Sequence, residues 1–324
     1  MFQWKVKNIA YREFTPTYLS GGKECSIGQE IINILNQHPN FELCKAFSRT
    51  AAETEVDGYN QLPTLKYSLL EDSNLDLDNI DIAILALSNG DSNKYVTEID
   101  LKYPDMILID ISSDHRFNPE WQYRLPDISR VKATKKISNP GCYASAIQFS
   151  IEPIKNLISG RVSCFGVSGY SGAGASPNEK NNKVNLQDNV IPYSLQGHIH
   201  EQEVKKYCYE NLSFSPHVGN FFRGILITSH IQLNKKNSIE EILSIYRDFY
   251  KNSSLINIDT EIPMLNKITK SHKVSIGGIA FDKTGINLTL CCVLDNLLKG
   301  AATQVIQNLN SACEIDELTG ITYE

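Results

Sequence analysis

Apolar positions in the first half of the chain alternate between short continuous runs and a run with helical spacing. In the helical run at residues 27–39, Ile31, Ile32 and Leu35 share one face, and Pro39 ends the pattern. The segment 80–87, IDIAILAL, is almost continuously apolar, which is typical of a strand covered on both faces. This alternation predicts βαβ units around a parallel sheet, with strands at residues 17–21, 42–47, 80–87 and 106–112.

The pattern changes from about residue 160 to longer strand-like runs. One clear helix is expected around residues 238–250, and the strand-like runs lie at residues 161–170, 222–233 and 286–295. These features predict a second domain built on a mostly antiparallel sheet with helices on one side. The segment after Lys299 has helical spacing and is expected to pack back on the first domain. We therefore expect domains at residues 1–141 and 142–299, followed by a returning helix at residues 300–324.

Composition narrows the class of protein. A chain of 324 residues is long enough for two cores, and a net charge of -6 gives no general attraction to nucleic acid. Neither a membrane span nor a secretion signal is visible, so we expect a soluble, cytoplasmic protein. The eight cysteines lack disulfide or zinc spacing, which favours reduced thiols and no metal site.

The segment KKISNPGCYASA carries the most chemical information. A strand-like run ends at Asn139, and a helix-like run begins at Cys142. A thiol at a helix N-terminus is stabilised as the thiolate by unpaired backbone N–H groups and by the helix dipole. Cys142 is therefore a candidate nucleophile, and the alternative is a small buried apolar residue.

Two further segments offer polar chemistry. His198 and His200, in GHIHEQEV, could supply a general acid or base, or belong to a surface loop or a metal pair. The segment FGVSGYSGAGASP contains many small residues, whose backbone N–H groups could approach an anion, unless it is only a flexible turn.

A loop that precedes the first helix resembles a dinucleotide-binding loop. Gly22 and Gly28 fit the first and third glycines of such a loop, but Cys25 stands where the second glycine would approach the pyrophosphate. By itself this imperfect pattern would not establish a cofactor site.

The ordered motifs together resemble the N-acetyl-γ-glutamyl-phosphate reductases of arginine biosynthesis, especially the reductase half of fungal two-function enzymes. The resemblance covers roughly residues 20–324 and rests on SNPGCYASA, GVSGYSGAGASP, PYSLQGHIHEQEV, FSPHVGNFFRGI and DNLLKGAATQ. It implies an α/β fold: a Rossmann-type NADP domain plus an α/β catalytic domain with a mixed, mostly antiparallel sheet. This fold is shared with aspartate-semialdehyde and glyceraldehyde-phosphate dehydrogenases.

The resemblance also implies roles for particular residues. Cys142 would be the nucleophile, and His200 the acid-base group with His198 as runner-up. The residues expected at the NADP site are Gly22, Cys25, Ser26, Gly28, Ser48, Arg49, Ser168, Gly169 and Asn296. The residues expected to bind the substrate are Ser113, Arg116, Asn139, His198 and His217.

The implied reaction is NADPH-dependent reduction of an acyl phosphate through a cysteine thioester, without a metal. The resemblance implies a homodimer or homotetramer, in the cytoplasm or, in a eukaryote, the mitochondrial matrix. Three departures are visible: Cys25 in the loop, Asp127 in place of a glutamate, and a first segment of 14 residues that matches nothing expected before the first strand. Alternatives are a reductase of aspartyl or carrier-bound aminoadipyl phosphate, or a non-enzymatic homologue with impaired cofactor binding.

Overall fold

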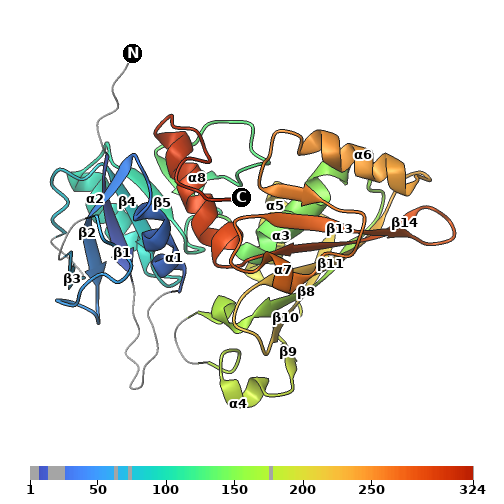
Figure 1. Cartoon of the computed structure of the whole chain (residues 1–324), viewed down its shortest axis with the longest axis horizontal. Helices are drawn as coiled ribbons and strands as arrows, with labels where there is room; N and C mark the ends of the chain where they lie inside the picture. Colours follow the sequence, from blue (N-terminus) through green and yellow to red (C-terminus); the bar gives the residue numbers. More distant parts are fainter. Residues whose placement is uncertain (1–6, 14–25, 62–64, 72–74, 175–177, 324) are drawn as a thin grey trace. The chain divides into compact units, whose positions relative to one another are not determined.

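The computed structural model describes residues 7–13, 26–61, 65–71, 75–174 and 178–323. Two compact units are distinguished by their internal contacts (Figure 1). The first unit comprises Met1–Pro140 and Ala301–Thr322, and the second comprises Gly141–Gly300 and Tyr323–Glu324. Within the described residues, no helix is long and apolar enough to cross a membrane.

The first unit contains a seven-stranded sheet in the order β3-β2-β1-β4-β5-β7-β6. Its described strand pairs are all parallel. The strands are β1 (Lys7–Glu13), β2 (Phe41–Ser48), β3 (Tyr67–Leu69), β4 (Ile82–Ala86), β5 (Ile107–Asp110), β6 (Gln122–Tyr123) and β7 (Lys136–Ser138).

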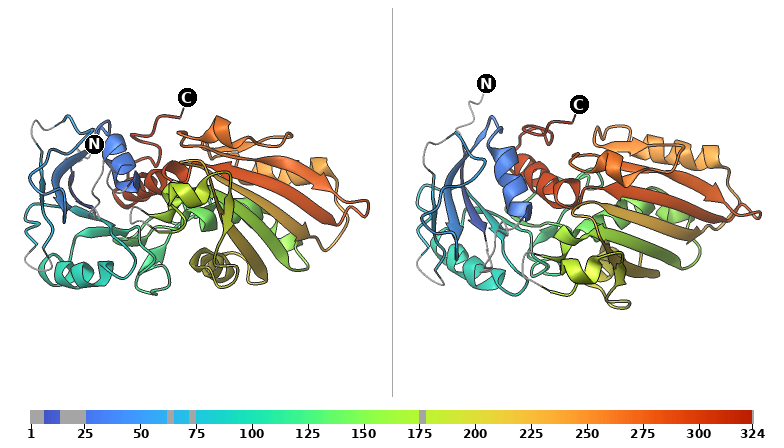
Figure 2. Two further views of the ribbon diagram at one scale, coloured as in Figure 1. Left: turned by 90° about the horizontal axis from the view of Figure 1, so that it is seen from below. Right: turned by 60° about the horizontal axis from the view of Figure 1, so that its bottom comes forward.

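Helices cover both faces of this parallel sheet. Figure 2 shows α1 (Ser26–Leu35) and α2 (Ser92–Lys102) on opposite sides of the strands. Helix α8 (Thr303–Ala312) contacts α1 and β5. The central strand β4 is buried throughout because it lies between helices on both faces, as its continuous apolar run predicts.

The first strand differs from its predicted position. We expected it at residues 17–21, which lie outside the described residues, whereas β1 occupies Lys7–Glu13. The sequence KNIAYRE has no continuous apolar run, so the pattern of a buried parallel strand did not reveal it. The opening 14 residues, for which the family resemblance offered no counterpart before the first strand, thus contain a strand that pairs with both β2 and β4.

The second unit contains a mixed seven-stranded sheet in the order β12-β13-β14-β11-β8-β10-β9. Most of its neighbouring strands are antiparallel, and β8–β10 and β12–β13 are parallel. The strands are β8 (Val162–Gly169), β9 (Val190–Pro192), β10 (Leu212–Gly219), β11 (Ile225–Gln232), β12 (Ile256–Ile258), β13 (Val274–Phe281) and β14 (Asn287–Leu294).

The longer helices of the second unit contact this sheet, in agreement with the predicted fold class. Helix α3 (Cys142–Ile151) packs on β11 and β14, α5 (Ile199–Tyr207) on β10, and α6 (Ile239–Phe249) on β12 and β13. The short helices α4 (Lys183–Leu186) and α7 (Leu265–Ile268) lie in connections between strands. The Rossmann-type parallel sheet and the mixed, mostly antiparallel sheet are therefore confirmed.

Candidate active site

Cys142 is the first residue of α3, as the sequence predicts. Gly141 caps the helix with φ -70° and ψ 148°, and as a glycine it has no side chain that could accept a hydrogen bond from the first turn. Cys142 is half-buried, whereas the other residues of α3 are buried. Cys142 therefore lies at the end of α3 where the backbone N–H groups of the first turn and the positive end of the helix dipole are found.

Two other cysteines of the second unit lie in a different environment. Cys164 and Cys292 are fully buried, and burial raises the pKa of each thiol to about 12. A thiol with such a pKa remains protonated near neutral pH and is a poor nucleophile. Exposure and helix position therefore distinguish Cys142 from these two residues.

The segment after β14 passes directly over Cys142. A β-carbon built on Gly300 would lie 2.9 Å from the β-carbon of Cys142 and 3.2 Å from the carbonyl oxygen of Asp295. Gly300 belongs to a π-helical turn, Leu298–Ala302, and its N–H donates to Asp295 over 2.8 Å. Only a glycine fits here without displacing the candidate nucleophile or the backbone beside it.

The two histidines lie at the start of α5, which packs on α3. His198 is the N-cap, and its Nδ1 accepts the backbone N–H of His200 over 3.1 Å. The two rings have centroids 4.8 Å apart, and both lie about 6 Å from the ring of Tyr143. The structure thus brings His198 and His200 together with the first turn of the cysteine helix.

Two tyrosines complete this cluster. The Tyr143 hydroxyl donates to the carbonyl of His217 over 2.5 Å, and burial raises its pKa well above the usual value. Burial, and then the charge of Cys142, also raise the pKa of Tyr193. Both hydroxyls therefore remain protonated at neutral pH and act as hydrogen-bond donors.

His217 lies on the opposite face of the sheet. Along β10, Phe214 faces Tyr143, and side chains alternate between faces, so the imidazole of His217 points away from α3. It packs on Phe165, with ring centroids 4.2 Å apart. Within one chain, the structure does not bring His217 together with Cys142.

Ser168, Gly169 and Asn296, which were expected at the cofactor, meet at the end of β8. The Asn296 amide donates to the Ser171 hydroxyl over 2.9 Å and accepts the N–H of Gly224 over 2.6 Å. A β-carbon on Gly169 would overlap the backbone of residues 222–223, so this glycine allows the two segments to approach. The small residues noted in the sequence therefore form a close backbone junction rather than a loose turn.

The remaining expected cofactor residues lie in the first unit. Ser26 and Gly28 are in the first turn of α1, which has no acidic residue in that turn, and Gly22 and Cys25 lie outside the described residues. Ser48 is buried, and its hydroxyl accepts the N–H groups of Thr50 and Ala51.

Arg49 follows β2 at the carboxyl edge of the parallel sheet. Its guanidinium donates to the Tyr95 hydroxyl over 3.0 Å and lies 3.6 Å from Asp91. A quarter of the Arg49 side chain is exposed. This edge is where dinucleotides bind in open parallel sheets.

The expected substrate residues Ser113, Arg116 and Asn139 also belong to the first unit. Arg116 is buried and donates to the carbonyls of Asn139 and Ile111 over 3.1 and 2.8 Å. The N–H of Ser113 donates to the side chain of Asn89 over 3.0 Å. Arg116 therefore holds together the ends of β5 and β7, next to the start of the second unit in the sequence.

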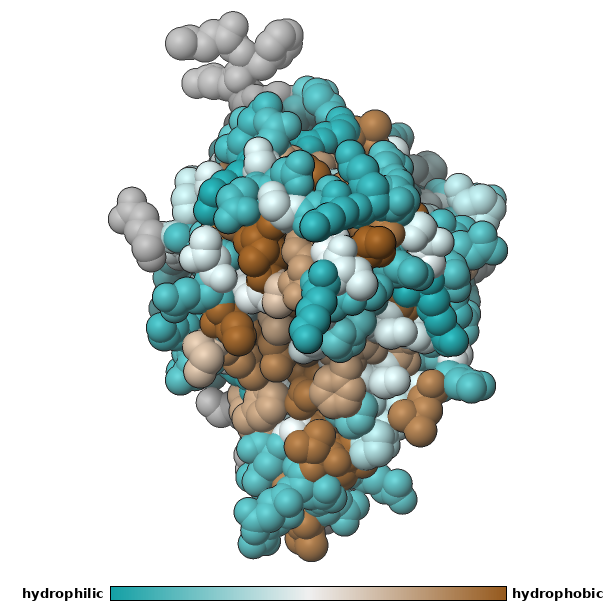
Figure 3. All heavy atoms as spheres, turned by 90° about the vertical axis from the view of Figure 1, so that its right-hand side faces the viewer, coloured by the Kyte–Doolittle hydropathy of each residue, from teal (hydrophilic) through white to brown (hydrophobic). Residues whose placement is uncertain are grey.

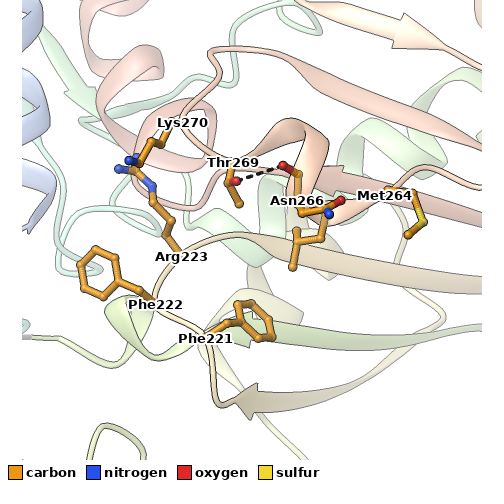
Figure 4. A pocket seen from close by; sticks show the side chains of 8 residues that line it. Phe221, Phe222, Arg223, Met264, Asn266, Thr269 and Lys270 are labelled. Atoms are coloured by element: carbon orange, nitrogen blue, oxygen red, sulfur yellow. Dashed lines mark hydrogen bonds between the residues drawn. The ribbon is translucent and has the colours of Figure 1, made fainter.

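A pocket in the second unit was not predicted. It has a volume of about 540 Å³ and lies between the β10–β11 connection and α7 (Figure 4). Arg223 lines the pocket and forms two hydrogen bonds to buried Asp295, over 2.6 and 2.9 Å. The other lining residues are Phe221, Phe222, Met264, Leu265, Asn266, Thr269 and Lys270.

Three residues near Cys142 were also missed in the sequence: Tyr193, Glu203 and Gly300. Each lies in a motif that was noted, but without a role of its own. Glu203 stands three residues after His200, a spacing that places both on one side of a helix and could have indicated a pair. Among the described residues, no group of three His, Cys, Asp or Glu side chains is arranged to hold a metal.

Comparison with known proteins identifies both units. Residues 22–136 match the semialdehyde dehydrogenase NAD-binding domain, and residues 142–296 match the semialdehyde dehydrogenase dimerisation domain. Among solved structures, aspartate semialdehyde dehydrogenase II from Vibrio cholerae, complexed with ASA, has a TM-score of 0.75 at 16% identity and covers 96% of this chain and 99% of its own. The Candida albicans aspartate semialdehyde dehydrogenase with NADP has a TM-score of 0.71 at 13% identity, covering 96% and 99%.

Sequence relatives are closer than these structures. An N-acetyl-gamma-glutamyl-phosphate reductase from Xylella fastidiosa (strain M23) is 41% identical over 96% of this chain and 97% of its own. The mitochondrial protein arg11 of Schizosaccharomyces pombe is 39% identical over 91% of this chain and 34% of its own. The chain therefore belongs to the N-acetyl-gamma-glutamyl-phosphate reductases, a family of oxidoreductases with a nicotinamide-dinucleotide-binding domain and a semialdehyde dehydrogenase dimerisation domain.

Proposed function

We propose that the protein reduces N-acetyl-γ-glutamyl phosphate to N-acetylglutamate 5-semialdehyde, with NADPH as reductant and release of phosphate. The observation that carries the proposal is the half-buried Cys142 at the start of α3, with the His198–His200 pair packed beside it. A helix N-terminus supports a thiolate, and a neighbouring imidazole can accept and return a proton. Family membership supplies the acyl-phosphate substrate class.

In the first step, the Cys142 thiolate attacks the γ-carbonyl, and the C–O bond to phosphate breaks to leave a thioester. Backbone N–H groups of the first turn of α3 stabilise the oxyanion of the tetrahedral intermediate. NADPH, when bound, would supply the hydride that reduces the thioester carbon. His200 donates the proton to the resulting thiohemiacetal oxygen and takes it back as the C–S bond breaks, which releases the aldehyde and restores the thiolate.

The residues of the first unit fit a dinucleotide. The start of α1 has no acidic residue in its first turn, so its backbone N–H groups and dipole favour the pyrophosphate. Arg49 at the end of β2 offers a partly exposed guanidinium to a ribose 2′-phosphate, which favours NADP over NAD. In the second unit, the amide of Asn296 and the close junction at Ser168 and Gly169 would hold the nicotinamide.

The polar residues Ser113, Arg116 and Asn139, of which Arg116 and Asn139 are buried, would orient the substrate together with His198. Arg116 contributes a positive charge, which suits a substrate that carries both a carboxylate and a phosphate.

The direct test is Cys142→Ser. At a helix N-terminus a hydroxyl remains protonated where a thiol ionises, so turnover of the acyl phosphate with NADPH should be lost while the melting temperature changes little. Iodoacetamide should also label Cys142 faster than Cys164 or Cys292, as read by peptide mass spectrometry. Near-normal turnover by the serine variant would refute the covalent step, and preferred turnover of aspartyl phosphate would reassign the substrate.

We also propose that the chain forms a dimer through the face of the second sheet that lies opposite α3. Phe165, Thr228 and Cys291 are direct cross-strand neighbours on that face, and Phe165 is 44% exposed. Figure 3 shows one side of the molecule, on which apolar side chains are exposed among hydrophilic ones. Exposed apolar surface of this kind is typical of an interface.

Light scattering tests this assembly. Phe165→Glu should lower the molar mass to that of one chain, because the interface would bury an unpaired charge. Leu101→Glu, at a residue of α2 that is 83% exposed, is the control and should not change the mass. An unchanged mass for both variants would place the interface elsewhere.

A further inference from the structure

Glu203 is a charged side chain with no exposed surface in the second unit. It lies in the middle of α5, facing α3, and one carboxylate oxygen accepts the backbone N–H of Gly141 over 2.9 Å. Its other oxygen lies 3.9 Å from Nε2 of His200. A buried carboxylate is costly unless it is paired, so these two neighbours help to retain it in the core.

Both neighbours belong to the proposed chemistry. Gly141 is the N-cap of α3 and directly precedes Cys142, so its orientation sets the first turn and the direction of the sulfur. His200 is the proposed acid-base group. The neighbouring carboxylate of Glu201 instead pairs with Lys205 on the same helix, so the two acidic residues of α5 have separate partners.

We propose that Glu203 is a positioning residue, whose single carboxylate holds the peptide before Cys142 and orients the ring of His200 toward the reacting groups. This inference rests on the proposed function. The hydrogen bond to Gly141 keeps the first turn of α3 in place while the thioester forms and breaks. The carboxylate also stabilises the imidazolium that forms when His200 takes a proton, because an opposite charge within about 4–6 Å favours the charged form.

The geometry explains why both effects come from one side chain. At 3.9 Å, the carboxylate of Glu203 and Nε2 of His200 are too far apart for a hydrogen bond, so the interaction between them depends on charge. Protonation of the His200 ring adds an electrostatic attraction to the carboxylate of Glu203, and such an attraction shortens the contact between the two groups. The carboxylate would therefore tighten on His200 during the steps in which His200 carries the proton.

The test compares Glu203→Gln with Glu201→Gln. Glutamine keeps the size of the side chain and an oxygen that can accept the N–H of Gly141, but it removes the charge. For Glu203→Gln we expect kcat to fall about 10-fold or more, with KM values within about twofold, because the acid-base step loses its support. Glu201→Gln, at a residue of the same helix that is also buried, should keep kcat within about twofold.

A second readout does not depend on the reductase activity. In protein labelled with ¹³C-histidine, NMR titration of the His200 ring, assigned with His200→Asn, should give a pKa about one unit or more lower in Glu203→Gln than in the wild type. Glu201→Gln should leave it unchanged. Other titratable groups of this cluster, namely Cys142, His198, Tyr143 and Tyr193, are the same in all three proteins.

The outcomes separate the two proposals. An unchanged His200 titration and a kcat within about twofold for Glu203→Gln would overturn the positioning role. If the His200 pKa is lower in Glu203→Gln but the wild-type protein does not reduce the acyl phosphate, the interaction is retained and the proposed function is refuted. Equal losses in Glu203→Gln and Glu201→Gln would assign both residues to folding and also overturn the proposal.

Discussion

The contact between Gly300 and Cys142 allows a sharp test of how the nucleophile is held. In Gly300→Ala, the added methyl carbon would lie 2.9 Å from the β-carbon of Cys142, whereas non-bonded carbons prefer about 3.5–4.0 Å. The overlap is therefore about 0.6 Å or more. The carbonyl oxygen of Asp295 and the side chain of Leu294, both at 3.2 Å, leave the methyl group little space in other directions.

Relief of this overlap should displace the first turn of α3. A misplacement of about 1 Å at a reacting group can cost about 10²-fold in rate, so we expect kcat to fall about 10- to 100-fold. The stability should change by only about 1–2 kcal/mol, because overpacking opposes the usual gain from replacing glycine by alanine. A large loss of activity in a folded protein is the expected signature.

The assay combines steady-state NADPH oxidation, thermal unfolding and the rate of iodoacetamide labelling at Cys142. Gly160→Ala is the matched control, because its methyl group would meet the end of the flexible Gln232 side chain, at 2.4 Å, which can swing away. Turnover and labelling of Gly300→Ala within about twofold of the wild type would refute the reasoning, since the nucleophile would then tolerate the displacement.

Three further predictions concern the histidines, the cofactor loop and a buried acid. His200→Asn should slow turnover by about 10²-fold or more and His198→Asn by less, and the reverse order in steady-state kinetics would exchange their roles. Cys25→Gly should tighten NADPH binding in calorimetry while kcat at saturation changes little, and no gain in affinity would contradict crowding of the pyrophosphate. Burial raises the pKa of Asp110 to about 6, so ionisation above that pH costs the folded state about 3 kcal/mol. Asp110→Asn should therefore gain stability relative to the wild type as the pH rises from 4 to 7 in urea unfolding, and a constant difference would contradict the raised pKa.

The elements that follow from the sequence are those whose burial leaves a clear apolar pattern. Strand β4 is buried on both faces and its residues are all apolar, so it was predicted where it lies. Strand β1 pairs on both sides through its backbone, which requires no particular side chains, and its mixed sequence gave no such signal. Backbone pairing without an apolar run is the part of this fold that sequence pattern alone could not reveal.

The candidate site also contains residues that neighbouring sequence reveals and residues that only the tertiary packing reveals. Cys142 was predicted at a helix start because a turn sequence and the helix that follows it are neighbours in the chain. The contact of Gly141 with Glu203 joins residues 62 positions apart, and in the sequence Glu203 has the pattern of a solvated charge on a polar helix. Only the packing of α5 on α3 reveals that this charge is buried.

The packing of α5 on α3 also explains how the nucleophile and the proton transfer can be supported side by side. The positive end of α3 stabilises the Cys142 thiolate, whereas the carboxylate of Glu203 lies on the side of His200. The helix dipole thus favours a negative charge on the sulfur, and the carboxylate favours a positive charge on the imidazole. In the proposed reaction these two charges change in opposite directions when the C–S bond breaks. Because these influences come from different elements, substitutions at Gly300 should affect mainly the position of the sulfur and substitutions at Glu203 mainly the titration of the histidine. If both substitutions altered both properties equally, the cysteine and histidine would form one coupled unit rather than two independently supported groups.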